Sequence, residues 1–320
     1  MIGSVIAGVA ALLMAVAMPM VLLSPVEIPE EPKLLVIEAE QPRQSEITVK
    51  LQTGQAMKEL PLEEYLIGVV LSEMPMSFEQ EALKAQAVAA RTFAMGQLDN
   101  GKHRDFDLCG QSSCCQAWTG EEMLARKLGD SWQAYWEKAS AAVESTEGQV
   151  LTYEGELIDA VYFSCSGGTT EDAVAVWGGD VPYLRSVESP GEEQAGKFHT
   201  VKEFSREDFC EIILQARPLA DLSGRTEGWI GKETRTEGGG IAEITIGGCT
   251  FKGTEIRQLF GLNSTNFTVE TENKKVIFSV YGYGHRVGMS QYGANAMAAE
   301  GKNYKEILCH YYDGVKVEKR

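Results

Sequence analysis

Residues 61–101 read PLEEYLIGVVLSEMPMSFEQEALKAQAVAARTFAMGQLDNG and decide the first part of the fold, because they encode two consecutive helices. Pro61 suits the first turn of a helix, where its missing N–H group leaves no hydrogen bond unmade. The first helix is expected to end near Met74, because the residue before Pro75 avoids helical backbone angles. One carboxyl group, Glu73, therefore lies at the seam between two helices, in an otherwise apolar run.

The second helix is predicted to begin after Ser77 and to run to about Asp99. Ser77 followed by Gln80 has the pattern of a capping box, and Gly101 interrupts the helical segment. Small side chains on one face would let other helices approach closely. These are Ala82, Ala85, Ala87, Ala89, Ala90 and Ala94.

Glu73 is a candidate general acid. A carboxyl group in an apolar setting holds its proton more tightly, because burial disfavours the charged form. Glycosidases keep a catalytic acid protonated near neutral pH in this way. Taken alone, however, Glu73 is better explained as a helix-end residue that faces water, so its own surroundings do not establish an active site.

Composition and length limit the class of protein. With 320 residues, 44% of them hydrophobic, the chain can form one or two domains. A formal net charge of −17 argues against binding to nucleic acid or to anionic lipid, since both carry phosphate groups. The acidity is otherwise explained by solubility.

The N-terminal region is predicted to attach the protein to a membrane. Residues 2–26 carry no charged side chain, and about 20 apolar residues are enough to cross a bilayer. We expect residues 1–26 to be an uncleaved transmembrane anchor, with a cleaved signal peptide as the alternative. Residues 27–45 are rich in Pro and Glu and are expected to form a spacer.

The remaining chain, residues 46–320, has the mixed order of helices and strands that is typical of the α+β class. Strands are expected at 46–51, 56–60, 149–153, 157–163, 241–246, 249–252, 266–271 and 275–281, and further helices at 121–146, 205–216, 253–260, 290–300 and 304–312. Trp132, Tyr135 and Trp136 are expected in the core. The long loop 164–192 is expected to be ordered, because it contains several large apolar residues.

The loop 102–118 is a candidate metal site. His103, Cys109 and Cys115 are spaced six and six, and imidazole and thiolate groups are the ligands that zinc prefers. A fourth ligand could come from Cys114, Asp107 or water, although neighbouring cysteines rarely bind one ion together. The alternative is a disulfide between Cys109 and either Cys114 or Cys115. The chain has seven cysteines, so they cannot all be paired within it.

The segment 281–297, YGYGHRVGMSQYGANAM, is a second candidate binding site. Its glycines let the backbone approach a ligand closely, and His285, Arg286, Ser290 and Gln291 supply hydrogen-bonding groups. Ser290 is also expected to cap the helix that follows. A glycine-rich turn with a capped helix explains most of the pattern without a ligand. The segment 164–168, SCSGG, lacks the glycines that flank a hydrolase nucleophile, which disfavours a serine or cysteine hydrolase.

Four blocks of sequence, taken together and in this order, resemble the stage II sporulation protein D family (SpoIID). They are EYLIGVVLSEMP (64–75), EALKAQAVAARTFA (81–94), SGGTTEDAVAVWGGDVPYLRSVESP (166–190) and GYGHRVGMSQYGANAMA (282–298). The resemblance extends from about residue 46 to the C-terminus. Cys114 and Cys165 depart from the family pattern.

The resemblance implies a peptidoglycan lytic transglycosylase. Such enzymes cleave between N-acetylmuramic acid and N-acetylglucosamine in glycan strands without stem peptides, and leave a 1,6-anhydro end. The family acts in forespore engulfment, with an amidase (stage II sporulation protein P) and a membrane protein (stage II sporulation protein M). It implies a single-pass protein of the cell membrane, whose catalytic domain is extracytoplasmic and faces the space between the engulfing membranes.

The resemblance also assigns roles to residues. Glu73 corresponds to the catalytic acid, and His103, Cys109 and Cys115 to a zinc site with a structural role. The residues expected to contact sugar are Arg91, Ser166, Tyr183, His285, Arg286, Ser290 and Gln291. We expect Arg91 or Arg286 to pair with the free lactyl carboxylate of the muramic acid.

Two other functions fit the same sequence. One is a noncatalytic wall-binding module, as in amidase enhancers, which resemble the same family. The other is a zinc hydrolase centred on His103, Cys109 and Cys115.

Overall fold

The computed structural model of the chain describes residues 47–320, apart from residues 55 and 273. These residues belong to one unit, Ser45–Arg320, which contains two hydrophobic cores. The expected membrane anchor (1–26) and spacer (27–45) lie outside the described residues. Within the described part, no helix has both the length and the apolar character needed to span a bilayer.

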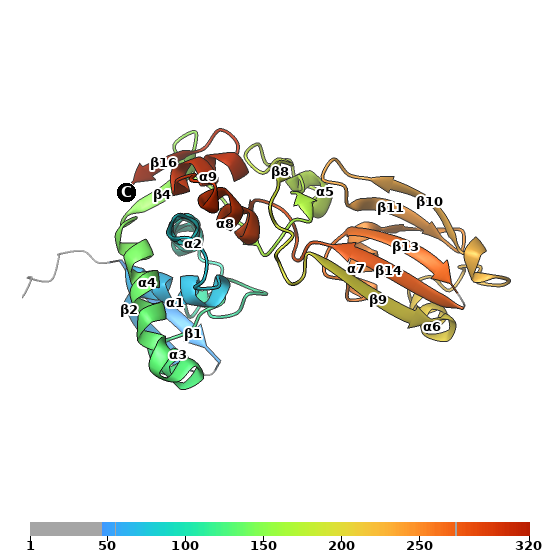
Figure 1. The fold of residues 1–320 in the computed structure, drawn as a ribbon, viewed down its shortest axis with the longest axis horizontal. Coiled ribbons are helices and arrows are strands. Elements are labelled where there is room, and N and C mark those ends of the chain that lie inside the picture. The colour runs from blue at the N-terminus through green and yellow to red at the C-terminus, as the bar shows by residue number, and fades with distance from the viewer. Residues whose placement is uncertain (1–46, 55, 273) are drawn as a thin grey trace, which may run out of the picture. The chain divides into compact units, whose positions relative to one another are not determined.

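The two consecutive helices are confirmed as α1 (Leu62–Glu73) and α2 (Gln80–Asn100) (Figure 1). Helix α1 ends because Met74 adopts extended backbone angles in front of Pro75. The predicted capping box at Ser77 is wrong, because Glu79 occupies the N-cap position and its side chain makes no capping hydrogen bond. The Glu79 N–H group instead donates to Oδ1 of Asn295, at 2.8 Å.

The first core surrounds α2, as its alanine-rich face predicts. Helix α2 contacts α1, α4 (Trp132–Glu144), α8 (Gln291–Ala299), α9 (Tyr304–Tyr311) and strand β4 (Gln149–Tyr153). Its six expected alanines are fully buried, because small side chains let so many elements pack around one helix. Strands β1 (Thr48–Thr53) and β2 (Ala56–Pro61) form the expected antiparallel hairpin, which contacts α1.

The single helix predicted at 121–146 is interrupted. Helix α3 (Glu121–Leu128) is followed by a short turn, and α4 (Trp132–Glu144) then begins. The break occurs at Gly129, whose φ of +56° does not fit a right-handed helix. The aromatic residues expected in the core are only half-buried: Trp132, Tyr135 and Trp136.

The second core lies between residues 199 and 281. One sheet joins β10 (Ile230–Arg235), β11 (Ile241–Ile246) and β12 (Cys249–Lys252), and another has the order β13-β14-β9. The elements of the second sheet and its helices are β9 (His199–Ser205), α6 (Arg206–Ala216), α7 (Gly253–Leu259), β13 (Asn266–Glu272) and β14 (Lys275–Tyr281). The strands expected after residue 240 are confirmed, whereas β9 and β10 were not predicted.

Two short strands bring distant parts of the sequence together. The predicted hairpin at 149–163 forms only in part: β4 pairs with β5 (Glu156–Leu157), but β6 (Tyr162–Phe163) pairs in parallel with β15 (Met289–Ser290). This pairing places the glycine-rich segment 281–297 beside residues 162–164.

The remaining elements are short. The loop 164–192 is ordered, as expected, and contains β7 (Gly168–Thr169), α5 (Ala173–Trp177) and β8 (Glu188–Ser189). Strand β3 (Leu108–Cys109) pairs with β1, and β16 (Lys316–Lys319) pairs with β4. For the described residues, the predicted α+β class is confirmed.

Candidate active site

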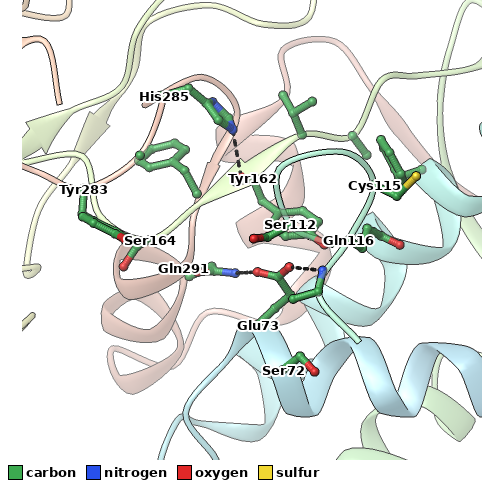
Figure 2. A pocket seen from close by; sticks show the side chains of 16 residues that line it. Ser72, Glu73, Ser112, Cys115, Gln116, Tyr162, Ser164, Tyr283, His285 and Gln291 are labelled. Atoms are coloured by element: carbon green, nitrogen blue, oxygen red, sulfur yellow. Dashed lines mark hydrogen bonds between the residues drawn. The ribbon is translucent and has the colours of Figure 1, made fainter. Parts of the chain in front are cut away.

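Glu73 borders two cavities. The first cavity, of about 440 Å³, lies between the end of α1, the loop 112–117, residues 160–164 and residues 283–285 (Figure 2). The second cavity, also of about 440 Å³, lies between residues 71–76 and helix α3. Ser72, Glu73, Ser164 and Gln291 line both. The seam between α1 and α2 therefore places the carboxyl group where the two cavities meet.

Two hydrogen bonds hold the Glu73 carboxyl group. The N–H group of Ala117 donates to Oε1 at 2.9 Å, and Nε2 of Gln291 lies 3.4 Å from Oε2. Burial raises the pKa of Glu73, and the two hydrogen bonds oppose that rise without cancelling it. Glu73 therefore keeps its proton to a higher pH than an exposed glutamate, as a general acid requires.

A chain of neutral polar groups runs from the wall of the first cavity to the buried Tyr65. The Tyr65 hydroxyl group donates to Oε1 of Gln116 at 2.9 Å, and Nε2 of Gln116 donates to the Tyr162 hydroxyl oxygen at 2.9 Å. Burial raises the pKa of Tyr65 and of Tyr162 well above the ordinary value. Sequence reasoning missed Gln116 and Tyr162, whose only signal was their position next to the cysteine loop and in an apolar strand.

His285, one of the residues expected to contact sugar, lines the first cavity. Its Nδ1 atom accepts a hydrogen bond from the N–H group of Val287 at 3.2 Å, which leaves Nε2 to donate to the carbonyl of Tyr162 at 3.1 Å. Burial lowers the pKa of His285 to about 4, so the ring is neutral at physiological pH. Because both ring nitrogens are occupied, the His285 ring forms part of the cavity wall and is not available as a base.

Ser166 and Ser290 do not line either cavity, contrary to the expected sugar contact. Both hydroxyl groups donate to the carboxylate of Glu192, which is 1% exposed. The same carboxylate accepts from the Ser189 hydroxyl group at 2.7 Å and from the Gly167 N–H group at 2.9 Å. Ser290 also caps α8, as predicted, by accepting from the N–H group of Gly293. Glu192 therefore fixes the start of the helix that carries Gln291.

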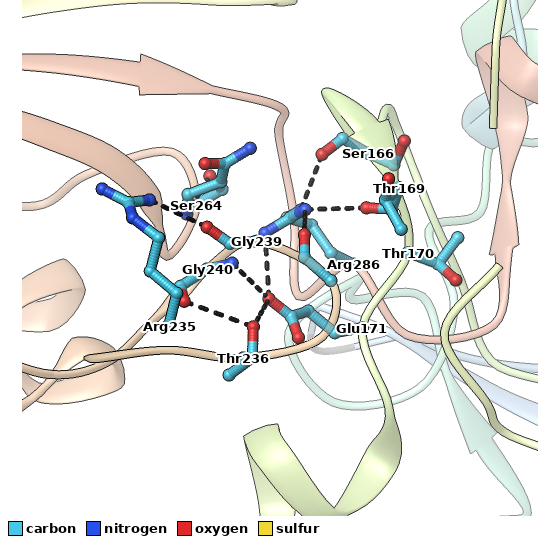
Figure 3. A network of polar contacts seen from close by, with 12 residues as sticks. Ser166, Thr169, Thr170, Glu171, Arg235, Thr236, Gly239, Gly240, Ser264 and Arg286 are labelled. Carbon is cyan, nitrogen blue, oxygen red and sulfur yellow. Dashed lines mark hydrogen bonds and ion pairs between the residues drawn. The ribbon is translucent and has the colours of Figure 1, made fainter. Parts of the chain in front are cut away.

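Arg286 belongs to a buried network rather than to the cavities (Figure 3). Its side chain is fully buried and forms an ion pair with Oε1 of Glu171 at 3.0 Å. It also donates to the carbonyl groups of Ser166, Thr169 and Gly238 at 2.6–2.7 Å. All three guanidinium nitrogens already donate inside the protein, and Arg286 lines neither cavity, so the structure does not favour the expected contact with substrate.

The Glu171 side of this network joins the two cores. Thr236 Oγ1 and the Gly240 N–H group donate to Oε1 of Glu171, at 2.9 and 3.1 Å. A Cβ atom on Gly240 would lie 2.3 Å from that oxygen, so only glycine fits there. Residues 236–240, which connect β10 and β11 of the second core, are thereby fixed to the loop that contains Glu171.

Arg91 and Tyr183 are also placed away from the cavities. Arg91 is fully buried, pairs with Glu63, and donates to the carbonyl groups of Val143 and Gln149 at 3.2 Å. The Tyr183 hydroxyl group accepts from the N–H group of Asp159 at 3.1 Å. The burial of both guanidinium groups therefore does not favour the expectation that Arg91 or Arg286 pairs with a substrate carboxylate.

The predicted metal ligands come together. The ligand atoms of His103, Cys109, Cys114 and Cys115 all lie within 4.8 Å of one another, and Nε2 of His103 is 3.3 Å from Sγ of Cys115. A tetrahedral zinc ion with bonds of about 2.0–2.3 Å separates its ligand atoms by roughly 3.5–3.8 Å, so this donor set fits zinc. All seven cysteines are free thiols, which does not support the disulfide alternative.

Cys114 joins the cluster, contrary to the expectation that neighbouring cysteines point apart. The N–H groups of Cys114 and Cys115 both donate to the carbonyl of Gln111, and this tight turn brings both sulfur atoms to one side. Asp107, the other candidate ligand, instead accepts from the N–H group of Lys50 at 2.8 Å. Cys115 also lines the first cavity, so the cluster lies in the cavity wall.

The chain is similar to known sporulation proteins. A family model described as stage II sporulation protein matches residues 51–153. Stage II sporulation protein D of Bacillus subtilis (strain 168) is 39% identical over 275 residues, which cover 85% of this chain and 78% of that protein. Stage II sporulation protein D of Bacillus amyloliquefaciens is 38% identical over 275 residues, which again cover 85% of this chain and 78% of that protein. An amidase enhancer of Bacillus subtilis (strain 168) is 31% identical over 78% of this chain and 39% of its own length.

Proposed function

Because the chain belongs to the stage II sporulation protein D family, we propose that it is a lytic transglycosylase that cleaves peptidoglycan between N-acetylmuramic acid and N-acetylglucosamine. One observation carries the proposal. Among the described residues that line the two cavities, Glu73 has the only carboxyl group, and its pKa is raised. Hydrolysis of a glycosidic bond ordinarily uses two carboxyl groups.

A single carboxyl group is enough when the nucleophile belongs to the substrate. The protonated Glu73 donates its proton to the glycosidic oxygen as the bond from C1 of muramic acid to that oxygen breaks. The resulting carboxylate then accepts the proton of the muramic acid 6-hydroxyl group, while the O6 atom bonds to C1. This closes the 1,6-anhydro ring and regenerates the protonated acid. Because the attack is intramolecular, no second carboxylate has to hold a water molecule.

The surrounding groups support this role of Glu73. Ala117 and Gln291 fix the orientation of the carboxyl group, and Gln116, Tyr162 and Ser164 offer neutral hydrogen-bonding groups to sugar hydroxyl and acetamido groups. His285 lines the first cavity, but both of its ring nitrogens are occupied. No other described histidine lines either cavity, so none of the described histidines is available as a competing base.

We further propose that the four-ligand cluster binds a structural zinc ion. Such an ion would hold the loop 109–117 in place, and with it the Ala117 N–H group that contacts Glu73. A catalytic zinc ion keeps an open position, whereas four protein ligands fill the coordination sphere. The arrangement therefore favours a structural ion over the zinc hydrolase.

Metal analysis tests this role. Purified protein should contain about one zinc ion per chain, and Cys109→Ser should lose it together with thermal stability and activity. Cys309→Ser is the matched control, because that exposed cysteine lies outside the cluster. Activity that disappears on chelation while the unfolding temperature stays constant would instead indicate a catalytic metal.

The cellular setting is proposed from the family. The protein would act in forespore engulfment, on glycan strands stripped by an amidase, with stage II sporulation proteins P and M as partners. It would be anchored in the cell membrane with its catalytic domain outside the cytoplasm.

The similarity to an amidase enhancer keeps a noncatalytic wall-binding module as the second candidate. Mass spectrometry of denuded glycan strands after digestion separates the functions. A lytic transglycosylase gives fragments with 1,6-anhydromuramic acid ends. A hydrolase gives reducing ends, one water heavier, and a binding module leaves the strands intact. Only the first result is compatible with the proposal.

A further inference from the structure

The two cavities that meet at Glu73 differ in charge. The first cavity is lined by aromatic and neutral polar side chains, including Tyr162, Tyr283 and the neutral His285. The second cavity is lined by apolar and aromatic residues of α1, α3 and α4, and by Lys127. Among the described residues lining either cavity, Lys127 is the only lysine or arginine.

Lys127 is available to a ligand. It lies in the last turn of α3, is exposed, and forms no ion pair with another residue that the structure describes. Its neighbour Arg126 lies 3.8 Å from Glu122 and lines neither cavity. In a chain with a net charge of −17, one unpaired ammonium group in a cavity wall creates a local preference for an anion.

The chemistry of the glycan strand provides one such anion. This step rests on the proposed function. The strand alternates two sugars, and only the muramic acid carries a lactyl group, which is a free carboxylate when no stem peptide is attached. Because Glu73 lines both cavities, the two sugars flanking the cleaved bond would occupy one cavity each.

We propose that the second cavity is the muramic acid subsite, with Lys127 pairing with the lactyl carboxylate, and that the first cavity takes the N-acetylglucosamine. This fixes the direction of the bound strand. The C1 atom of muramic acid approaches Glu73 from the α3 side, and the O4 leaving group lies on the side of Tyr162 and His285. The anhydro ring is therefore formed in the second cavity, and the neutral sugar leaves from the first.

The test compares two forms of one substrate: denuded strands with free lactyl carboxylates, and the same strands with those groups converted to methylamides. Wild-type protein should prefer the carboxylate form, as judged by kcat/KM. Lys127→Met should raise KM for that form by about fivefold to tenfold and bring the preference close to one, because a charged contact is lost. Lys127→Arg should keep most of the preference, and Arg126→Met, the matched control, should keep all of it.

Two results would overturn the inference. One is an unchanged preference in Lys127→Met, and the other is an equal loss on both substrates, which would indicate a structural role. If the wild-type protein yields no anhydro product, the proposed function has failed instead. The affinity of Glu73→Gln for the two strand types, with and without Lys127→Met, then still decides whether Lys127 recognises the carboxylate.

Discussion

The cavity around Glu73 and the network around Arg286 each contain a buried carboxyl group, but they differ in the partners that they give it. Glu171 in the network has a guanidinium partner at 3.0 Å and two further donors on the same oxygen. Glu73 has no cation beside it in the first cavity and only two neutral donors, one of them 3.4 Å away. The first arrangement stabilises a charge in order to join two parts of the protein. The second keeps a proton available beside open space.

The same block of sequence contributes to both regions. Within 281–297, Gln291 and His285 line the first cavity, whereas Arg286 and Ser290 are fully buried and bind Glu171 and Glu192. Neighbouring residues of one motif therefore have two different roles. Some line the cavity, and others stabilise the surrounding structure. Substitutions in the two groups should have separable effects on activity and on stability.

The largest expected effect on stability comes from the network. Arg286→Met leaves Glu171 buried without its counter-ion, and we expect a loss of about 3–5 kcal/mol in the free energy of unfolding. Chemical denaturation measures it. Arg185→Met is the matched control, since Arg185 is 38% exposed and pairs with acids at the surface, and it should cost no more than about 1 kcal/mol. Equal losses in the two variants would contradict the comparison.

A smaller effect is expected from pH acting on His285 in the cavity wall. The folded state lowers the pKa of His285 from 6.5 to about 4, so between these values the unfolded chain binds a proton that the folded protein does not. Stability is therefore lost as pH falls through this window, with a slope of at most about 1.4 kcal/mol per pH unit. His285→Gln should reduce that slope.

Unfolding curves at several pH values between 4 and 7 provide the measurement. His199→Gln is the control, because His199 is exposed and lines neither cavity, so the wild-type slope should remain. A slope unaffected by His285→Gln would show that the ring titrates normally and is not buried as described.

The smallest expected effect concerns how acidic Glu73 is. The hydrogen bond from Gln291 lowers the pKa of Glu73 against the effect of burial, so Gln291→Met should raise that pKa further. The alkaline limb of the profile of kcat/KM against pH should then move to higher pH, by less than about one unit for one weak hydrogen bond. A shift to lower pH would mean that Gln291 does not act on Glu73 as a donor.

The sequence predicts elements whose local signals agree with their surroundings. Pro75, the alanine face of α2 and the capping residue Ser290 act through neighbours in the chain, and the structure confirms each of them. Ser77 has the same kind of local signal and fails. A contact with Asn295, more than 200 residues away, satisfies the N-terminus of α2 in its place.

The site was harder to predict, because its partners come from distant segments. Glu73 receives its two hydrogen bonds from residues 117 and 291, and β6 reaches the site only by pairing with β15. The local sequence does not show that Arg286 is buried with all its nitrogens hydrogen-bonded, whereas Lys127 lines a cavity. The charge of a residue is visible in the sequence, but the availability of that charge depends on burial.

The most direct test of the account is to measure product formation and unfolding temperature together for Glu73→Gln. Burial raises the pKa of Glu73, so the folded state favours its protonated form, and that contribution to stability is lost as pH rises through the folded-state pKa. A neutral glutamine avoids this loss. We predict that anhydro product falls at least about 100-fold at pH 7 while the unfolding temperature stays equal or rises. Product that persists, or an unfolding temperature that falls together with activity, would contradict the assignment of Glu73 as the catalytic acid.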